Sequence, residues 1–365
     1  MKKLKAALKK EFSRNVYFYD SGRSALLKIL EGLKRDGRDE VIVQSYTCVV
    51  VVNAIIAAGY KPVYVDLDKN GINMCVKDLK KKISKNTRAM IVQHTFGFPD
   101  KIDEIKNLTK DHKFFLIEDL AHSINGKYKD KLLGTYSDAA FISFGSGKVL
   151  SSSRGGVALT KRLKLENDEL LPLEKTWKHL LKIVCFEFLK PIYFFFRIGK
   201  TKIYLLSKLG FLPKVITQQE KQGLAPEVFS YSPKLASIAY MQWKGRKKNL
   251  RHRRKLAATY SKELKDIVEF PKYNEEAAYM RFPIFVDDPE KLFKFMKKHH
   301  ILLGVEWSGA VIVPKSIDLR KTKYKGGCPQ AEKTALRIIN LPTDRHVSVK
   351  KAKAITKLIK KFYAN

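Results

Sequence analysis

The chain has 365 residues, of which 45% are hydrophobic, so it can bury a sizeable core and is expected to divide into two domains. Its 72 basic and 36 acidic residues give a net charge of +36, which indicates an anionic environment or partner. The basic residues are spread along the chain and form no zinc-finger, RRM or helix-turn-helix pattern, so no specific binding of nucleic acid is expected.

The charge is explained most simply by a lysine-rich composition that solvates every exposed face. Attraction to an anionic membrane would add to it. The four cysteines, Cys48, Cys75, Cys185 and Cys328, are scattered without a close pair, so neither a metal site nor a disulfide framework is indicated. This pattern favours a cytoplasmic protein.

The N-terminal segment Met1–Lys10 is basic and lacks the apolar stretch of a secretory signal, so a helix is expected there. From about Tyr17 to Thr160, short β-prone runs alternate with helical stretches such as Arg23–Lys34 and Val49–Ala58. This alternation predicts a largely parallel sheet covered by helices, forming a large domain over residues 1–160. The predicted strands are Val41–Val43, Pro62–Val65, Ala89–Val92, Phe114–Ile117 and Ala139–Phe144.

Residues 161–228 form a second unit, whose segment Leu171–Pro213 is rich in large apolar residues interrupted by charges. It contains no uncharged run of the length that spans a bilayer. Two alternatives stay open: a helix pair lying in a membrane interface, or an insertion packed on a dimer partner. In the first, lipid would meet Trp177, Phe186, Phe188, Tyr193, Phe194 and Phe195, and headgroups would meet Lys178, Lys182, Lys190, Arg197, Lys200 and Lys202.

The remaining residues, 229–365, are expected to contain a long basic helix and a smaller domain. The helix is predicted over Ser230–Lys265, and a small α/β domain over Ile267–Asn365.

Two short segments of the large domain carry functional groups. The strand Phe114–Ile117 ends at two carboxylates, the second of which is Asp119, and His122 follows; open α/β sheets expose such groups at their carboxyl edge. The β-prone run Phe141–Phe144 leads through a Gly/Ser turn to Lys148. A lysine can form a Schiff base with a carbonyl cofactor, and an aspartate can keep a pyridine nitrogen protonated. This combination indicates pyridoxal 5'-phosphate (PLP).

These segments resemble the DegT/DnrJ/StrS family of sugar aminotransferases, in which a strand end I-E-D-x-A-Q/H precedes a segment S-F-x-x-x-K. The family's lysine follows its aspartate by 29 residues, as Lys148 follows Asp119 here. The resemblance implies fold type I of the PLP-dependent transferases, with a mostly parallel seven-stranded sheet in the large domain and a smaller C-terminal α/β domain. Further matching segments, in the family's order, are Ser21–Leu26, Asp39–Val43, Lys61–Asp66, His94–Gly97, Gly155–Gly156, Arg281–Ile284 and Lys325–Pro329.

The resemblance assigns a role to each candidate residue near the cofactor ring. Lys148 would hold the cofactor covalently and move a proton, with a solvated surface lysine as the alternative. Asp119 would pair with the pyridine nitrogen, where the alternative is a helix N-cap. His122 stands where the family commonly has glutamine and would lie against the ring or its O3′ oxygen, with a structural histidine as the alternative.

The cofactor phosphate is expected at a helix N-terminus. Gly22, Arg23 and Ser24 precede a helix that begins near Ala25, so backbone N–H groups and the positive helix end would face a phosphate dianion. The resemblance assigns Arg23 and Ser24 to this contact, and Ser143 supplies a further hydroxyl.

Four departures from the family concern the substrate and the cofactor. The aromatic residue that usually stacks on the cofactor ring falls on Cys48, so either the thiol packs there or Tyr46 compensates. The acidic residue before Gly-Gly is replaced by Arg154, which would bind an anion or replace a lost contact. The region Phe229–Ser232 lacks the asparagine that many relatives extend to a partner's phosphate, and Gly304–Trp307 is not followed by the family's histidine-containing substrate loop.

The resemblance therefore implies a homodimeric PLP-dependent aminotransferase, cytoplasmic and either free or at the inner face of the membrane. It would transfer an amino group, from glutamate, to a nucleotide-linked keto-sugar in the synthesis of surface polysaccharide or glycan. The alternative is a divergent homologue of the same fold that is non-catalytic or regulatory and membrane-associated. The retention of Lys148 and Asp119 favours the enzyme.

Overall fold

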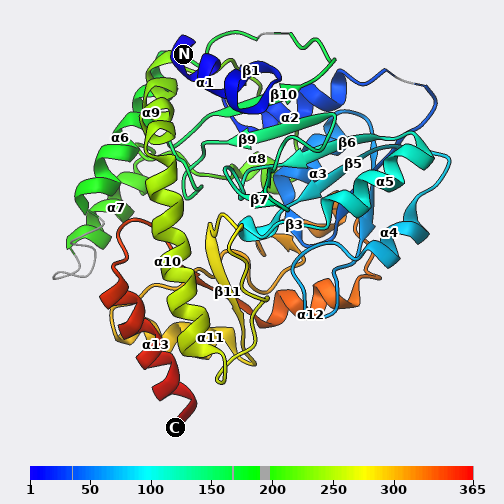
Figure 1. The fold of residues 1–365 in the computed structure, drawn as a ribbon. Helices are drawn as coiled ribbons and strands as arrows, with labels where there is room; N and C mark the ends of the chain where they lie inside the picture. Colours follow the sequence, from blue (N-terminus) through cyan, green and yellow to red (C-terminus); the bar gives the residue numbers. More distant parts are fainter. Residues whose placement is uncertain (35, 167, 190–197, 365) are drawn as a thin grey trace.

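The structure is a computed structural model that describes residues 1–34, 36–166, 168–189 and 198–364. A seven-stranded sheet forms the centre of its larger part, in the order β1-β10-β9-β6-β5-β2-β4 (Figure 1). Strands β4, β2, β5, β6 and β9 are parallel, and β10 runs antiparallel between β9 and β1. The strands are β1 (Asn15–Tyr19), β2 (Glu40–Gln44), β4 (Lys61–Val65), β5 (Thr87–Gln93), β6 (Phe115–Asp119), β9 (Ala139–Ser143) and β10 (Gly156–Thr160). The predicted mostly parallel sheet is confirmed.

The alternation of side chains along the strands divides the core between the two faces of the sheet. On one face, Ile42, Met90 and Leu116 join the cluster that contains residues of α4 (Val76–Lys82) and α5 (Ile102–His112). Residues of opposite parity in the same strands, such as Val41, Ile91 and Ile117, belong to the larger cluster with α2 (Gly22–Glu31) and α3 (Val49–Ala57). Helices thus cover both faces, as the predicted βαβ alternation requires.

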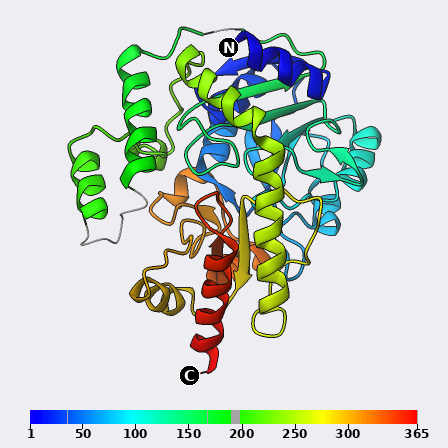
Figure 2. The ribbon, with the colours of Figure 1, turned by 60° about the vertical axis from the view of Figure 1, so that its left-hand side comes forward.

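The smaller C-terminal part contains an antiparallel pair of strands, β11 (Arg281–Phe285) and β13 (Ile338–Pro342), flanked by helices. Here α13 (Val349–Ala364) packs against α10 (Arg246–Leu264) and α11 (Pro289–Lys298). The two ends of the chain lie at opposite ends of the molecule (Figures 1 and 2). The remaining elements include α1 (Lys2–Phe12), α12 (Pro329–Arg337), β3 (Thr47–Cys48), β12 (Ile312–Val313), β7 (Lys127–Tyr128), β8 (Lys131–Leu132), η1 (Thr95–Gly97) and η3 (Leu319–Thr322).

The single long helix predicted over Ser230–Lys265 is wrong, because the structure has two helices there. These are α9 (Pro233–Lys244) and α10, and Gly245 separates them. Gly245 keeps a right-handed backbone conformation, with φ −81° and ψ 0°, but its ψ angle differs from the typical helical value and interrupts the regular helix. Arg246 then donates to the carbonyl oxygen of Trp243 at 3.2 Å, which stabilises the junction.

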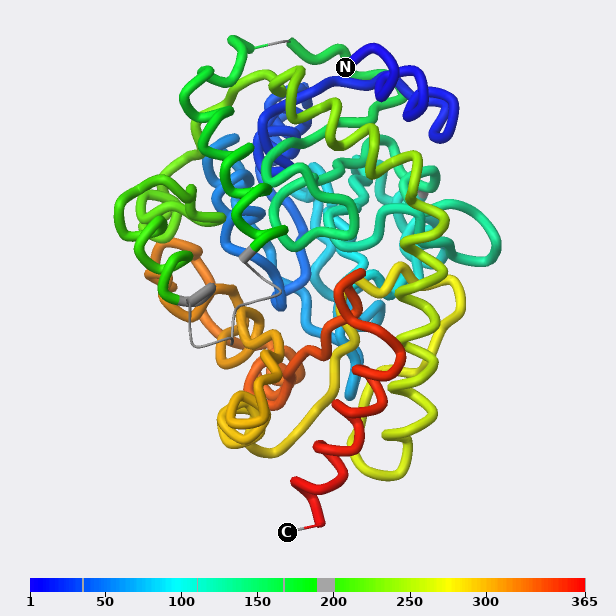
Figure 3. Tube along the Cα trace, turned by 90° about the vertical axis from the view of Figure 1, so that its left-hand side faces the viewer, coloured from blue at the N-terminus to red at the C-terminus, as the bar shows by residue number. Residues whose placement is uncertain are grey.

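Between β10 and α9, the described residues form α6 (Leu173–Leu189) and α7 (Ile198–Lys208) at one side of the molecule, and α8 (Gln218–Lys221), which packs against α3 (Figure 1). Figures 2 and 3 show α6 and α7 outside the helices that cover the sheet. Tyr193, Phe194, Phe195, Lys190 and Arg197, which the membrane alternative invoked, lie outside the described residues. Among the described helices, none is both long and apolar enough to cross a bilayer. The boundaries proposed at residues 160 and 228 stay a prediction.

Candidate active site

The carboxyl edge of the large sheet opens into a cavity of about 380 Å³. Its floor includes Gln93, Asp119 and Ser143, the last residues of the parallel strands β5, β6 and β9. The edge of a parallel sheet collects such side chains because every strand ends there. Residues from the C-terminal part, among them Arg281, close another side of the cavity.

The two carboxylates at the end of β6 point to opposite faces of the sheet. Asp119 lines the cavity, whereas Glu118 is fully buried on the other face. Glu118 accepts hydrogen bonds from the amides of Gly134 (2.6 Å), Tyr136 (3.1 Å) and Ser137 (3.0 Å). Glu118 therefore fixes a loop, and Asp119 is the carboxylate available to a ligand.

Asp119 and Lys148 influence each other's protonation. Burial raises the pKa of Asp119 to about 6, although the Ala121 amide that donates to its Oδ1 at 2.8 Å and the charge of Lys148 act against this rise. Lys148, which follows β9 through a turn and is half-buried at the cavity, has its pKa lowered by burial, and the charge of Asp119 opposes that shift. The cavity thus holds a carboxylate and an amine whose charged forms both depend on a nearby opposite charge.

His122 is held as a neutral ring by aromatic neighbours. It stacks on Phe96 with the ring planes 4° apart and meets Trp307 edge-on at 5.0 Å between centroids. Burial, followed by the charges of Lys148 and Arg281, lowers its pKa well below the usual value. Its Nδ1 accepts from the Phe96 amide at 3.2 Å, so the neutral ring carries its proton on Nε2.

The N-terminus of α2 faces the cavity at Gly22 and Arg23. The Ser21 side chain caps the helix by accepting from the Ser24 amide at 3.2 Å. A Cβ atom on Gly22 would lie only 2.8 Å from Cβ of Ser143, so glycine is needed for the helix end to approach β9. The geometry gives a cradle of backbone N–H groups beside one hydroxyl, as an anion requires.

The structure gives Ser24 and the Arg23 side chain other partners. Ser24 is fully buried, does not line the cavity, and donates to Oδ1 of Asp20 at 2.7 Å. The Arg23 guanidinium pairs with Glu220 of α8 and donates to the Val215 carbonyl oxygen at 2.7 Å. Contacts of these two side chains with a phosphate therefore stay a prediction, and the backbone of the helix end is the better-placed group.

Arg154 lines the cavity and forms an ion pair with the buried carboxylate of Asp20, with Nε at 2.8 Å from Oδ2.

Cys48 also lines the cavity, and burial raises the pKa of its thiol, which favours the neutral form. Tyr46 does not line the cavity but packs edge-on behind Trp307 at 5.4 Å. Cys48 is thus at the cavity and Tyr46 behind it, and the stacking role of either residue stays a prediction.

Sequence reasoning missed several residues that line the cavity: Arg281, Glu306, Trp307, His179, Lys182 and Lys214. Arg281 was recognised only as part of a strand, although its place at the start of β11 could have identified it. The membrane alternative placed Lys182 at lipid headgroups, whereas its side chain is 8% exposed and lines the cavity. The inward orientation of the Lys182 side chain could not be predicted from the sequence, because a lysine on an apolar helix normally lies on the solvent-facing side.

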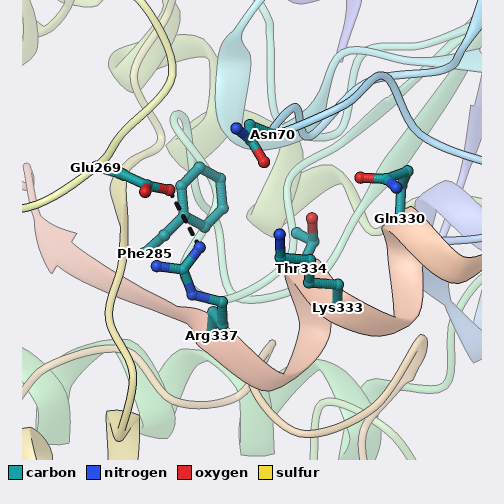
Figure 4. A pocket seen from close by; sticks show the side chains of 7 residues that line it. All are labelled: Asn70, Glu269, Phe285, Gln330, Lys333, Thr334 and Arg337. Atoms are coloured by element: carbon teal, nitrogen blue, oxygen red, sulfur yellow. Dashed lines mark hydrogen bonds and ion pairs between the residues drawn. The ribbon is translucent and has the colours of Figure 1, made fainter.

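A second pocket, in the C-terminal part, has a volume of about 10 Å³ (Figure 4). Arg337 crosses it to reach Glu269, with Nη1 at 3.1 Å from Oε2. The space suffices for about one water molecule, so this pocket is no candidate for an organic ligand.

The residues of the large cavity fit the cofactor that the sequence predicts. PLP needs an acid for its pyridine nitrogen, an amine for its aldehyde and donors for its phosphate. Asp119, Lys148 and the N-terminus of α2 with Ser143 supply these three groups around one cavity. The glycine at position 22 leaves the space that the phosphate end requires.

Comparison with known proteins agrees with this geometry. The model of the DegT/DnrJ/EryC1/StrS aminotransferase family matches residues 5–171 and 200–360, and so leaves out residues 172–199, which include α6. A GDP-perosamine synthase of Escherichia coli O157:H7 is 36% identical over 140 residues, 38% of each chain. One of Vibrio cholerae is 31% identical over 168 residues, 44% of this chain and 46% of that one. The matched segments thus span less than half of these relatives.

Solved structures of low sequence identity share the fold. DesV of S. venezuelae superposes with a TM-score of 0.76 at 20% identity, covering 100% of this chain and 89% of that one. PseC of Helicobacter pylori, an aminotransferase involved in the biosynthesis of pseudoaminic acid, gives a TM-score of 0.74 at 18% identity, covering 99% and 90%. The expected fold is therefore confirmed over the whole chain.

Proposed function

Because the chain belongs to the DegT/DnrJ/EryC1/StrS aminotransferase family, we propose that it is a PLP-dependent aminotransferase acting on a nucleotide-linked keto-sugar in glycan biosynthesis. The amino donor in this proposal is glutamate. The observation that carries the proposal is the meeting of Lys148, Asp119 and the N-terminus of α2 at one cavity. The names of the relatives, GDP-perosamine synthases among them, support the substrate class.

Bound PLP would supply an electron sink for the carbanion formed at the donor's Cα atom. Asp119, as a carboxylate, would hold a proton on the pyridine nitrogen. The amine of Lys148 would attach the aldehyde carbon covalently, and burial favours its reactive neutral form by lowering its pKa. When it is not attached to the cofactor, the same Nζ would accept the proton from Cα of the donor and deliver it to the carbon that was the cofactor's aldehyde.

The test is direct on the purified full chain supplied with PLP. Borohydride reduction followed by mass spectrometry should place the cofactor mass on the peptide containing Lys148. Glutamate added to the loaded, unreduced protein should yield 2-oxoglutarate in a single turnover. If neither result appears, the chain is a non-catalytic homologue of the same fold.

We propose further that the protein is a cytoplasmic homodimer. Large apolar side chains are exposed on one face of α6 and along α7, including Trp177 (55%), Phe188 (74%) and Tyr204 (62%). Such a patch calls for a covering partner, and a second copy fits the expectation for the family. Peripheral contact with an anionic membrane is the other outcome, and flotation with anionic and with neutral liposomes tests it.

A further inference from the structure

Helix α6 packs Leu180 and Ile183 against the core, yet it also buries polar side chains and exposes large apolar ones. Its inward face carries Thr176, His179 and Lys182, which are 1%, 6% and 8% exposed. Its outward face is apolar, with an exposed stripe at intervals of four, four, three and four residues: Leu173, Trp177, Leu181, Val184 and Phe188. A helix that turns polar groups inward needs a polar partner there, and the cavity lies on that side.

The inward groups are fixed in place at the cavity wall. His179 Nδ1 lies 2.9 Å from Oγ of Ser153, and Lys182 donates to the carbonyl oxygen of Pro213 at 2.7 Å. Lys214, the next residue along the chain, also lines the cavity. Burial, then the charges of Arg154 and Lys182, lowers the pKa of His179 to about 3, so the ring is neutral. Burial lowers the pKa of Lys182 to about 8.

The cations of this wall differ in their partners. Arg23 is paired with Glu220, and Arg154 with Asp20. Within the described residues, no carboxylate lies at ion-pair distance from Lys182 or Lys214. A buried ammonium group whose acceptor is a single carbonyl oxygen is costly, and an anionic ligand would offset that cost.

We propose that Lys182 and Lys214, with the neutral ring of His179, form a subsite for the diphosphate group of the nucleotide-linked sugar. The inference rests on the proposed function, since it names residues that would hold that substrate. Lys182 is buried and Lys214 is exposed, and their two positive charges match the two negative charges of a diphosphate diester. The cofactor phosphate has a separate cradle at Gly22 and Ser143, so it does not account for these lysines.

Two of the three residues of the subsite, His179 and Lys182, belong to α6, which lies outside the ranges matched by the family model, whereas Lys214 lies inside the matched range 200–360. The helix lies at the cavity wall while Lys148 and Asp119 come from the sheet. We therefore expect α6 to contribute to the choice of substrate rather than to the chemistry.

The experiment measures binding of inorganic pyrophosphate to the PLP-loaded enzyme by calorimetry, for the unchanged protein and for Lys182→Gln and Lys214→Gln. Each substitution should weaken pyrophosphate binding by about tenfold or more, because a charged hydrogen-bond donor is lost. Lys178→Gln is the matched control, because Lys178 lies one turn away on α6 and pairs with Glu174 at 2.6 Å. This variant should bind pyrophosphate as tightly as the unchanged protein does. Circular dichroism and thermal unfolding check that each variant folds.

A second measurement separates this subsite from the rest of the cavity. The single turnover with glutamate contains no diphosphate, so Lys182→Gln should change its rate far less than it changes pyrophosphate binding. Equal losses in both measurements would overturn the subsite, as would unchanged pyrophosphate binding. Binding of pyrophosphate only after PLP is removed would also overturn the subsite, because it would place the anion where the cofactor phosphate is expected, at Gly22 and Ser143. If pyrophosphate binds as expected but glutamate gives no turnover, the subsite stands and the proposed function fails.

Discussion

Glu118 and Asp119 are adjacent carboxylates on β6, and their surroundings shift their pKa values in opposite directions. Burial alone would raise both. For Glu118, the hydrogen bonds from His94, Gly134 and Ser137 outweigh burial and lower its pKa. Asp119 has one amide donor, so burial prevails and its pKa rises to about 6. A ligand that brings a positive charge to Asp119 would add to the effect of Lys148, whose charge alone does not offset burial.

We predict that Asp119→Asn stabilises the cofactor-free protein. The folded pKa of Asp119 lies above its usual 3.8, so the stability that its neutral form provides is complete below pH 3.8 and is lost as the pH rises through about 6. Relative to the unchanged protein, the free energy of unfolding should rise by roughly 2–3 kcal/mol at pH 8 and by little at pH 4. Denaturant unfolding at the two pH values checks this.

The same substitution should slow the single turnover with glutamate in the loaded protein, because an amide cannot stabilise a protonated pyridine nitrogen. An unchanged rate would exclude the assigned role of Asp119.

The neighbouring substitution Glu118→Gln should have the opposite effect on stability. It replaces a carboxylate that accepts from three amides and the Ser137 hydroxyl, so we expect a loss of roughly 2–3 kcal/mol at pH 7. The pKa of Glu118 is lowered, so its stabilisation is present above its usual 4.5 and is lost as the pH falls. The difference between variant and unchanged protein should therefore shrink in acid, as measured by unfolding at pH 7 and pH 4.

Lys148→Ala should abolish covalent attachment of PLP and reduce transamination by roughly a thousandfold or more, because the nucleophile and the proton carrier are lost together. Lys127→Ala, on an exposed strand, serves as the control. The readouts are borohydride fixation with mass spectrometry and the rate of 2-oxoglutarate formation. Turnover near that of the unchanged protein would rule out Lys148 as the attachment residue.

At the scale of elements, the approach of α2 to β9 forms the phosphate cradle. Gly22→Ala would place a methyl group 2.8 Å from Cβ of Ser143, so the helix end must move away from the strand. We expect PLP to bind about tenfold more weakly. Gly245→Ala is a matched control, because its added methyl group meets nothing nearer than 3.7 Å. Equal PLP affinity of Gly22→Ala and the unchanged protein in equilibrium titrations would show that the cradle is not used.

The elements of the sheet could be predicted from the sequence because each strand of the parallel core is a short β-prone run, as in Val41–Val43 and Ala89–Val92. Asp119 could be predicted as a site residue because it ends a strand, and Lys148 because it follows a strand through a short turn. The break at Gly245 could not be read from periodicity, since the basic residues continue on both sides of it. The inward turn of Lys182 was not predictable either, because it depends on a cavity built by distant segments.

At the scale of the whole molecule, we predict a homodimer that uses the outward face of α6. Val184→Ser combined with Phe188→Ser should shift the protein toward monomers in sedimentation, because both side chains are more than half exposed in the single chain. Leu336→Ser, which removes an equally exposed leucine on α12, should leave the assembly unchanged. A strictly monomeric unchanged protein with full turnover would contradict the prediction.

The separation of α6 from the sheet also matters for how such a protein can diversify. The groups proposed for the chemistry, Gly22, Asp119 and Lys148, all precede residue 160, whereas the cavity wall at 179, 182 and 214 belongs to a later stretch of the chain. Mutations in that wall can accumulate without touching the attachment of the cofactor. A library randomised at these three positions would therefore sample new acceptor sugars, while borohydride fixation at Lys148 sorts folded, loaded variants from damaged ones.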